Sequence, residues 1–422
     1  LQTPHMEDLA HQGTTYTAYC PSPLCMPCRS AFMTGRRVHQ IQTYSNCATN
    51  VTRDLTSYGA ELGAEGVYSV HAGKSHVYCP PEELGFSELL GAGGFGVPGD
   101  IENRRNPLCI RKGAALRADG FGPDEKTAIG DRKTVDAAIN WLENTGRALD
   151  QPWGMTVNIN NPHFPHYTPQ QYWDLYPEGG DLPSFGPECE SAQHPRVRDL
   201  MAHFETGQFQ EHQIRGLRRG YLGCVSFVDY QLGRLITALR AAGRYEDTNV
   251  IYTSDHGEML GKFGLWWKCS LYEDSVRIPC IASGPDFSSG HRHPTPIDLH
   301  DIQASLFRSC GASRPADWVG IPLQDIPEDE PDRLVFSEYH GHGARASSFM
   351  VREGFWKYIH HIEAPHQLFD LRNDPDELTD LYNAEPAKAA HLERRLREIC
   401  NPELENTRAE AFIEAQQDVS AQ

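Results

Sequence analysis

"PLCMPCRSAFMTGRR", residues 23–37, contains two cysteines, Cys25 and Cys28, that are separated by two residues, one of which is Pro27. The spacing first suggests a redox Cys-x-x-Cys motif, but such a site requires a strand before it, and the upstream "YCPSP" is broken by prolines. A structural zinc site would require a second cysteine or histidine pair at ligand spacing, and the other cysteines supply none. Neither interpretation explains the segment.

The composition limits the classes of protein to which the chain can belong. Its 422 residues are 39% hydrophobic and 10% aromatic, which is enough to bury a large core. The 38 Lys and Arg residues against 57 Asp and Glu residues give a net charge of −19, which argues against nucleic-acid binding. No run approaches the roughly 18 apolar residues of a membrane helix. The twelve scattered cysteines predict mostly reduced thiols and leave a few disulfides open.

Three segments predict an α/β core. Residues 152–161 and 248–257 are short β-branched apolar runs that end in polar residues, as buried parallel strands do. Residues 220–243 lie between them, and their apolar side chains recur at helical spacing up to Gly243. Near the start, residues 3–13 predict a helix with Thr3 as N-cap. Strand, helix and strand in this order predict an α/β sheet.

The C-terminal part of the chain has a different pattern. An acidic, proline-containing linker begins at 326, and short strand-like runs follow at 334–340, 347–353 and 355–361 before a helical end. We therefore predict two domains, at 1–325 and 326–422, and the second is a small antiparallel sheet with helices. "GAGGFG" (91–96) matches a dinucleotide-binding pattern, but it follows the helix-like "SELL" and Pro98 blocks a following helix, which argues against such a site.

Read as Cys25-x-Pro27-x-Arg29 followed by Thr34-Gly35-Arg36, the opening segment resembles the signature of the type I sulfatases of the alkaline phosphatase superfamily. In that family a formylglycine-generating enzyme oxidises the first cysteine to formylglycine (3-oxoalanine). The resemblance implies that Cys25 is the precursor of the nucleophile and that Arg29 stabilises charge on it. Cys28 stands where the family usually has serine. A buried structural Cys25 is the alternative. The implied fold has a central mixed, mostly parallel sheet flanked by helices.

Two further segments extend the resemblance. "HAGKSHVY" (71–78) resembles the family's Gly-Lys-x-His, which implies that Lys74 binds sulfate and that His76 lies beside the nucleophile. "NNPHFPH" (160–166) resembles the segment whose histidine, here His163, faces the leaving-group oxygen. A histidine with a pKa of about 6.5 can donate that proton near neutral pH. We interpret His166 as an exposed loop residue.

"SDHGEMLGKFGLWWKCSLYEDSVRIP" (254–279) is the second strong match, and its part "GLWWKCSLYE" (264–273) is most similar to the choline-sulfatase-like and phosphonate-hydrolase-like branch. The resemblance implies Asp255 and His256 as metal ligands and Lys268 as a second sulfate-binding lysine. Oxygen ligands suit Ca²⁺ or Mg²⁺, and the histidine also admits Mn²⁺. We expect Ca²⁺.

One element of the family is not found in these 422 residues. Family members begin with a buried strand that ends in an Asp-Asp pair and completes the metal site, and the helix that residues 3–13 match comes after it. We therefore expect that the native protein has a preceding strand, without which the chain binds metal poorly. A signal peptide would lie in the same place, so the compartment stays open, with a lean to the bacterial cytoplasm.

The implied reaction is hydrolysis of an alkyl or aryl sulfate monoester. A hydroxyl of the hydrated aldehyde attacks sulfur, the alcohol leaves with a proton from His163, and a covalent sulfo-enzyme results. His76 then helps to remove the proton of the second hydroxyl, so that the carbonyl re-forms as sulfate departs. The pair of Lys74 and His76 matches the single negative charge of a sulfate ester. This match favours a sulfatase over a phosphonate monoester or phosphodiester hydrolase on the same scaffold.

Two other classes of protein, the substrate and the assembly state stay open. An inactive binding protein predicts an unmodified Cys25, and a redox protein predicts a Cys25–Cys28 disulfide. "EYHGHG" (338–343) carries Glu338, His340 and His342, which we interpret as a solvated strand end rather than as residues that read the alcohol. Relatives often oligomerise, so a homo-oligomer is one expected state.

Overall fold

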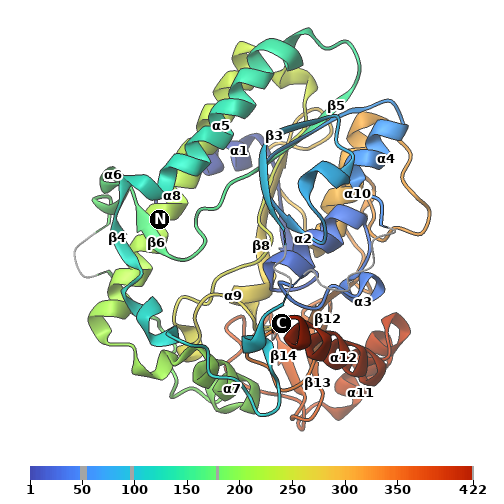
Figure 1. The fold of residues 1–422 in the computed structure, drawn as a ribbon. Coiled ribbons are helices and arrows are strands. Elements are labelled where there is room, and N and C mark those ends of the chain that lie inside the picture. The colour runs from blue at the N-terminus through green and yellow to red at the C-terminus, as the bar shows by residue number, and fades with distance from the viewer. Residues whose placement is uncertain (48–54, 96–98, 177–179, 421–422) are drawn as a thin grey trace.

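The computed structural model describes residues 1–47, 55–95, 99–176 and 180–420 (Figure 1). Its N-terminal part contains a sheet of order β10-β1-β8-β7, with β9 paired to β1, and a separate sheet of order β3-β2-β5. The strands are β1 (Gly13–Tyr19), β2 (Tyr68–Val77), β3 (Glu88–Phe95), β5 (Trp153–Asn158), β7 (Val250–Thr253), β8 (Arg277–Ser283), β9 (His291–Arg292) and β10 (Ile297–Asp298). A small sheet pairs β4 (Phe121–Pro123) with β6 (His166–Thr168).

Helices cover both sheets. They are α1 (Pro4–Gln12), α2 (Cys25–Thr34), α3 (Val38–Ile41), α4 (Tyr58–Ala64), α5 (Ile129–Trp141), α6 (Gln170–Trp173), α7 (Pro195–Phe204), α8 (Glu211–Ala241), α9 (Glu273–Val276), α10 (Leu299–Cys310), α11 (Pro386–Ile399) and α12 (Pro402–Ser420). The long α8 and α5 run side by side along one flank (Figure 1). Within the described residues, no helix is long and apolar enough to cross a membrane.

The predicted first helix forms, but its cap differs from the expectation. Thr3 occupies the N-cap position of α1 without a capping hydrogen bond from its side chain. The carboxylate of Asp229, from the distant α8, instead accepts hydrogen bonds from the backbone N–H groups of His5 (3.2 Å) and Met6 (2.7 Å). An anion at a helix N-terminus satisfies otherwise unpaired N–H groups, so α1 is capped through tertiary packing.

The α/β prediction is confirmed, with corrections to the strand pairing. β5 is parallel to β2, but β7 is antiparallel to β8, because the chain turns back directly after the 254–276 segment. β5 and β7 therefore belong to different sheets. Glu88–Phe95 is a strand, so the helical interpretation of "SELL" is wrong, and the glycines of "GAGGFG" up to Gly94 lie inside that strand.

A cavity of about 620 Å³ lies between the two sheets and is lined by residues of both β5 and β7. Every residue of these two strands is only half-buried, although apolar runs of this kind are normally buried inside a sheet. Among the described residues, β5 pairs only with β2 and β7 only with β8. We call this space the slot; α8 lines it with Leu232 and Ile236.

The C-terminal part forms the predicted antiparallel sheet. Its order is β11-β12-β13-β14, with β11 (Leu334–Tyr339), β12 (Ser348–Glu353), β13 (Trp356–His361) and β14 (Gln367–Asp370). The first three strands match the three predicted runs, and β14 was not predicted. Leu392 and Leu396 of α11 pack in the same buried cluster as Phe349 of β12. The predicted boundary after residue 325 stays a prediction.

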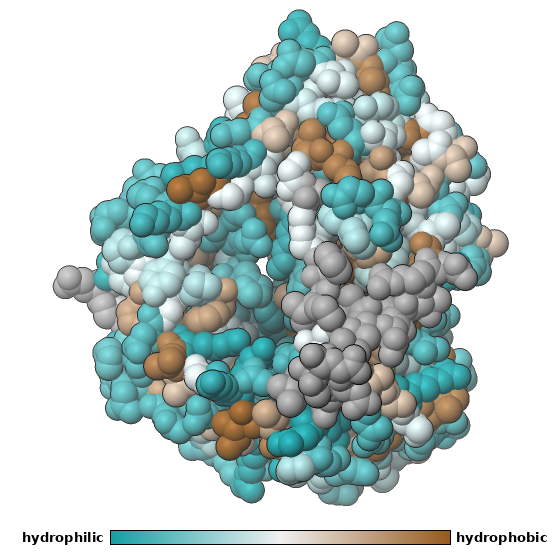
Figure 2. Space-filling model, viewed as in Figure 1, coloured by the Kyte–Doolittle hydropathy of each residue, from teal (hydrophilic) through white to brown (hydrophobic). Residues whose placement is uncertain are grey.

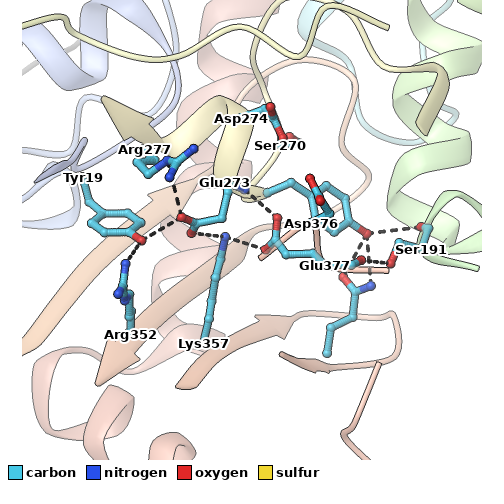
Figure 3. Close-up of polar contacts among 12 residues, drawn as sticks. Tyr19, Ser191, Ser270, Glu273, Asp274, Arg277, Arg352, Lys357, Asp376 and Glu377 are labelled. Atoms are coloured by element: carbon cyan, nitrogen blue, oxygen red, sulfur yellow. Dashed lines mark hydrogen bonds and ion pairs between the residues drawn. The ribbon is translucent and has the colours of Figure 1, made fainter. Parts of the chain in front are cut away.

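A buried ionic network joins the C-terminal sheet to the N-terminal part (Figure 3). The ammonium of Lys357 on β13, which is fully buried, lies 3.0 Å from Glu273 Oε1 of α9 and 2.7 Å from Glu377 Oε1. Glu273 also accepts a hydrogen bond from the hydroxyl of Tyr19 on β1 (2.8 Å), and Tyr19 in turn contacts Arg352 of β12. Ion pairs and hydrogen bonds of buried charged residues therefore connect the C-terminal sheet to the N-terminal part.

The outer surface agrees with the acidic composition. On the face shown in Figure 2 the residues are mostly hydrophilic, apolar residues form small separate patches, and the surface is hollowed near the centre. A site for an anionic substrate must therefore concentrate its cations locally.

Candidate active site

Cys25 occupies the first position of α2. The helix begins there, after Leu24 as N-cap, and ends before Gly35, whose φ of 61° places it in the left-handed region. Cys25 is only 2% exposed, and its Sγ lies 3.2 Å from His256 Nε2. Burial raises the pKa of this thiol, but the charges of Lys268 and His256 outweigh burial and hold the pKa well below its usual value. The position thus favours an anionic, reactive group.

Arg29 lies one turn further along α2 and binds Asp255. Its Nε donates to Asp255 Oδ2 at 2.7 Å, and its Nη1 donates to the carbonyl of Lys74 at 3.3 Å. Burial raises the pKa of Asp255, but Arg29 and His256 outweigh burial and the pKa is lowered. Cys28 supports the same residue, because its thiol donates to the Asp255 carbonyl at 2.8 Å, so the two cysteines point to different partners.

Asp255 and His256 follow β7, as the sequence predicted, and they can hold a metal ion. Their ligand atoms and Cys25 Sγ lie within 4.8 Å of one another. His256 Nδ1 lies 3.0 Å from the carbonyl of Gly257, which can only accept, so Nδ1 carries the hydrogen. When the ring is neutral, the lone pair is on Nε2, which faces Cys25, and this is the arrangement in which a histidine coordinates a metal.

His163 and Lys268 form a close pair. His163 Nδ1 donates to the carbonyl of Phe164 at 2.6 Å, so His163 Nε2 accepts from Lys268 Nζ at 2.8 Å. Although His163 is exposed, the ammonium of Lys268 and, to a smaller extent, desolvation lower its pKa to about 4. His163 is therefore neutral at neutral pH in the free protein, which corrects the expectation of an ordinary histidine that donates a proton there.

Replacing Lys268 by glutamine is expected to raise the pKa of His163 from about 4 toward the ordinary value near 6.5, because the largest cause of its depression is the Lys268 ammonium. The pKa can be followed by NMR titration of the His163 ring, assigned with a His163→Ala variant. Lys133, an exposed lysine of α5, supplies the matched control as Lys133→Gln. A pKa that stays near 4 in the Lys268 variant would show that desolvation, not charge, controls this histidine.

The glycine-lysine-histidine segment is only partly brought to the site. Lys74 lines the cavity, where burial and the Arg29 charge lower its pKa against the opposing charge of Cys25. His76 has a φ of 48°, does not line the cavity, and its Nδ1 is buried without a hydrogen-bond partner in the described part of the chain. His71, which was not predicted, does line the cavity, and neither of its buried ring nitrogens has a described partner.

Two carboxylates that the sequence interpretation missed position the predicted residues. Glu258 accepts hydrogen bonds from the backbone N–H groups of Trp267 (2.5 Å) and Leu260 (3.3 Å), so it closes the loop that presents Lys268. Burial raises the pKa of Glu258 to about 7. Asp131 of α5 accepts from the backbone of the segment before His163, at 2.7 Å from Asn160 N and 2.9 Å from Asn161 N.

The "EYHGHG" segment is neither a solvated strand end nor part of the cavity wall. Glu338, His340 and His342 are all buried, and none lines the cavity. The carboxylate of Glu338 accepts a hydrogen bond from His39 Nδ1 and lies 2.9 Å from His340 Nε2. Its charge therefore interacts with two buried histidines and not with solvent or substrate. His166 is likewise buried, on β6, and contacts the carbonyl of Leu217 rather than lying in an exposed loop.

Comparisons with known proteins agree with this geometry. A family model described as "Sulfatase" matches residues 1–312, and a model described as "N-sulphoglucosamine sulphohydrolase, C-terminal" matches residues 261–402. The chain is 31% identical to a choline-sulfatase of Rhizobium meliloti over 402 residues, which cover 90% of this chain and 78% of that protein. It is 28% identical to arylsulfatase K of Danio rerio over 432 residues, which cover 94% and 79%.

Two solved structures have the same fold. A phosphonate monoester hydrolase of Silicibacter pomeroyi gives a TM-score of 0.75 at 22% identity and covers 94% of this chain and 90% of that chain. A 2-O GAG sulfatase gives a TM-score of 0.70 at 21% identity and covers 93% and 86%. At these identities the likeness describes the fold alone.

Proposed function

The chain belongs to the sulfatase family and is a sulfatase, and on this premise we propose that it hydrolyses an alkyl or aryl sulfate monoester at the cavity around Cys25. The observation that carries the proposal is the convergence of Lys268, His163 and His256 on the buried Cys25 at the start of α2. A cluster of cations beside Cys25 supports the proposal, because such a cluster stabilises the negative charge on a group-transfer nucleophile.

We propose that Cys25 is oxidised to formylglycine and that Asp255 and His256 hold a divalent metal. Formylglycine supplies a hydroxyl nucleophile and the metal supplies a Lewis acid. The donor set supports this, because a half-buried carboxylate and an imidazole whose neutral form has its lone pair on Nε2 meet beside Cys25. Oxygen and imidazole donors fit Ca²⁺, Mg²⁺ or Mn²⁺, and Ca²⁺ is our first expectation.

The other side chains around Cys25 bind the sulfate, position Asp255 and supply a proton. Lys74 and Lys268 bind the non-bridging sulfate oxygens, and Arg29 holds Asp255 in place. Bound sulfate brings negative charge to Lys268, which offsets the field that lowers the pKa of His163. His163 can then hold a proton for the departing alcohol oxygen. The proposed role of His76 rests on the resemblance alone.

A direct comparison of rates tests this function. We expect kcat/KM for 4-nitrophenyl sulfate to exceed that for 4-nitrophenyl phenylphosphonate, because a sulfate ester offers three non-bridging oxygens to the two lysines and a phosphonate monoester offers two. A phosphonate monoester hydrolase is the alternative, and the fold shared with such an enzyme is the observation that favours it. Faster turnover of the phosphonate would favour the alternative, and turnover of neither ester by protein with modified Cys25 would contradict both.

We also propose that the slot receives a β-strand from a segment that precedes Leu1 and that ends in carboxylates beside Asp255. In the described part of the chain, β5 and β7 each have an edge on the slot with no paired strand, and the segments after both strands lead into the site, at Asn160 and Asp255. A strand between these edges would satisfy their backbone groups and cover their half-buried apolar side chains.

The 422-residue chain is accordingly expected to bind Ca²⁺ only weakly, with a Kd above about 10⁻⁴ M, because Asp255, His256 and one cysteine-derived group supply fewer ligands than Ca²⁺ takes. Isothermal titration calorimetry measures this, and Asp255→Asn is expected to remove the remaining binding. Asp136→Asn, a change of an acidic side chain in a surface ion pair on α5, is the control. Micromolar binding at one site per chain would mean that the described residues complete the site without a further strand.

A further inference from the structure

Arg117 lies in a short 3₁₀ helix (Ala114–Asp119) and is held by three aromatic side chains. Its guanidinium carbon is 5.1 Å from the ring centre of Trp267 and 5.5 Å from those of Phe164 and Phe204. The rings contact one another edge to face, with centroids 5.3 Å apart for Phe164–Trp267 and 5.0 Å for Phe204–Trp267. Cation–π contacts of this kind fix the plane of a guanidinium and leave its N–H edge available.

The charge of Arg117 has no counterion in the described part of the chain. Its side chain is half-buried and forms no ion pair or hydrogen bond there. The nearby Arg111 differs, because it pairs with both Asp100 (3.3 Å) and Glu102 (3.1 Å). Burial and the charge of Arg111 lower the pKa of Arg117, and a bound anion would act in the opposite direction by favouring the charged guanidinium.

The aromatic cluster adjoins the proposed sulfate site. Phe164 directly follows His163 and lines the cavity, and Trp267 directly precedes Lys268. Trp267 and Cys269 have φ values of 65° and 82°, so the backbone on either side of Lys268 is held in an unusual conformation. His163 and Lys268, which contact each other at 2.8 Å, thus each carry a neighbour that packs on Arg117.

We propose that Arg117 is a specificity-determining residue that binds a carboxylate on the alcohol part of the sulfate ester. The inference rests on the proposed function and names its substrate class as an anionic alcohol. A planar guanidinium with a free N–H edge matches a carboxylate through two parallel hydrogen bonds. The same cluster disfavours a quaternary ammonium alcohol, because the aromatic faces that would bind it already hold a cation.

Matched substrates test the proposal. Arg117→Gln is expected to lower kcat/KM for 4-carboxyphenyl sulfate by about 10- to 100-fold, which is the effect of a lost charged hydrogen-bond pair. For phenyl sulfate the same variant is expected to change kcat/KM by less than about 3-fold, because the sulfate-binding lysines are untouched. Arg111→Gln is the control, since its charge is already paired, and it is expected to change both rates by the same factor.

The outcomes separate this inference from the proposed function. Turnover of phenyl sulfate by the wild type supports the function, and an equal loss on both substrates in Arg117→Gln then overturns only the role of Arg117. Faster turnover of choline sulfate than of 4-carboxyphenyl sulfate would also overturn it. Binding of the product 4-hydroxybenzoate, measured by calorimetry, needs no turnover: its affinity should fall about 10-fold or more in Arg117→Gln, and an unchanged affinity counts against the proposal.

Discussion

Replacement of Cys25 by serine is expected to lower kcat for an aryl sulfate by on the order of 10³-fold or more, because removal of a covalent nucleophile has effects of that size or larger. Serine keeps a hydroxyl at the start of α2, but it cannot re-form a carbonyl to release sulfate. The measurement is single-turnover and steady-state hydrolysis of 4-nitrophenyl sulfate by protein produced with a formylglycine-generating enzyme.

Cys28→Ser is the matched control for this experiment. Its thiol donates to the Asp255 carbonyl, and a serine hydroxyl can donate to the same group. We expect kcat within a few-fold of the wild type, together with the mass of an aldehyde at position 25 in the tryptic peptide. A Cys25→Ser protein that retained full activity would exclude the formylglycine mechanism. A Cys25–Cys28 disulfide in native protein would instead favour redox chemistry.

Replacement of Lys357 by methionine is expected to lower the free energy of unfolding by about 3–5 kcal/mol. The substitution removes the ammonium that lies 3.0 Å from Glu273 Oε1 and 2.7 Å from Glu377 Oε1, and both carboxylates are buried. They would then be left facing each other inside the protein without a counterion on that side. Urea unfolding followed by circular dichroism gives the free energy, provided that the transition is two-state.

The control for Lys357 is Lys133→Met on the surface of α5, where the change in stability is expected to stay within about 0.5 kcal/mol. A double variant, Lys357→Met with Glu377→Gln, removes a buried negative charge together with the cation. It is expected to be more stable than Lys357→Met alone. If Lys357→Met unfolded at the same urea concentration as the wild type, the network in Figure 3 would not hold the two parts together.

The residues that the sequence located are those that follow strands or begin helices. The family resemblance implied Asp255, His256 and Cys25, and the local pattern adds that an apolar run ends just before Asp255 and that a helix starts at Cys25. Strand ends and helix starts can be recognised in the sequence, because they depend on residues that are close along the chain. Lys74 and Lys268 were located only through the family resemblance.

The properties that were missed depend on partners far along the chain. The neutral state of His163 comes from Lys268, 105 residues later, and the cap of α1 comes from Asp229, 224 residues after His5. Glu258 was missed because the donors to its carboxylate are backbone N–H groups, which leave no residue pattern in the sequence. Glu338 looked exposed because a charged strand end usually is, but two histidines and the rest of the protein cover it.

The position of Cys25 sets a time limit on its proposed oxidation. In the folded protein the side chain is only 2% exposed, so a modifying enzyme cannot reach it there. The contact that closes over its sulfur is made by His256, which lies 231 residues further along the chain. The preceding strand β1 finds its partner only when β8 has been synthesised, because Gly13 pairs with Ser283. During translation, Cys25 thus remains accessible while most of the N-terminal part is still being made, and the slow long-range pairing supplies the interval for modification.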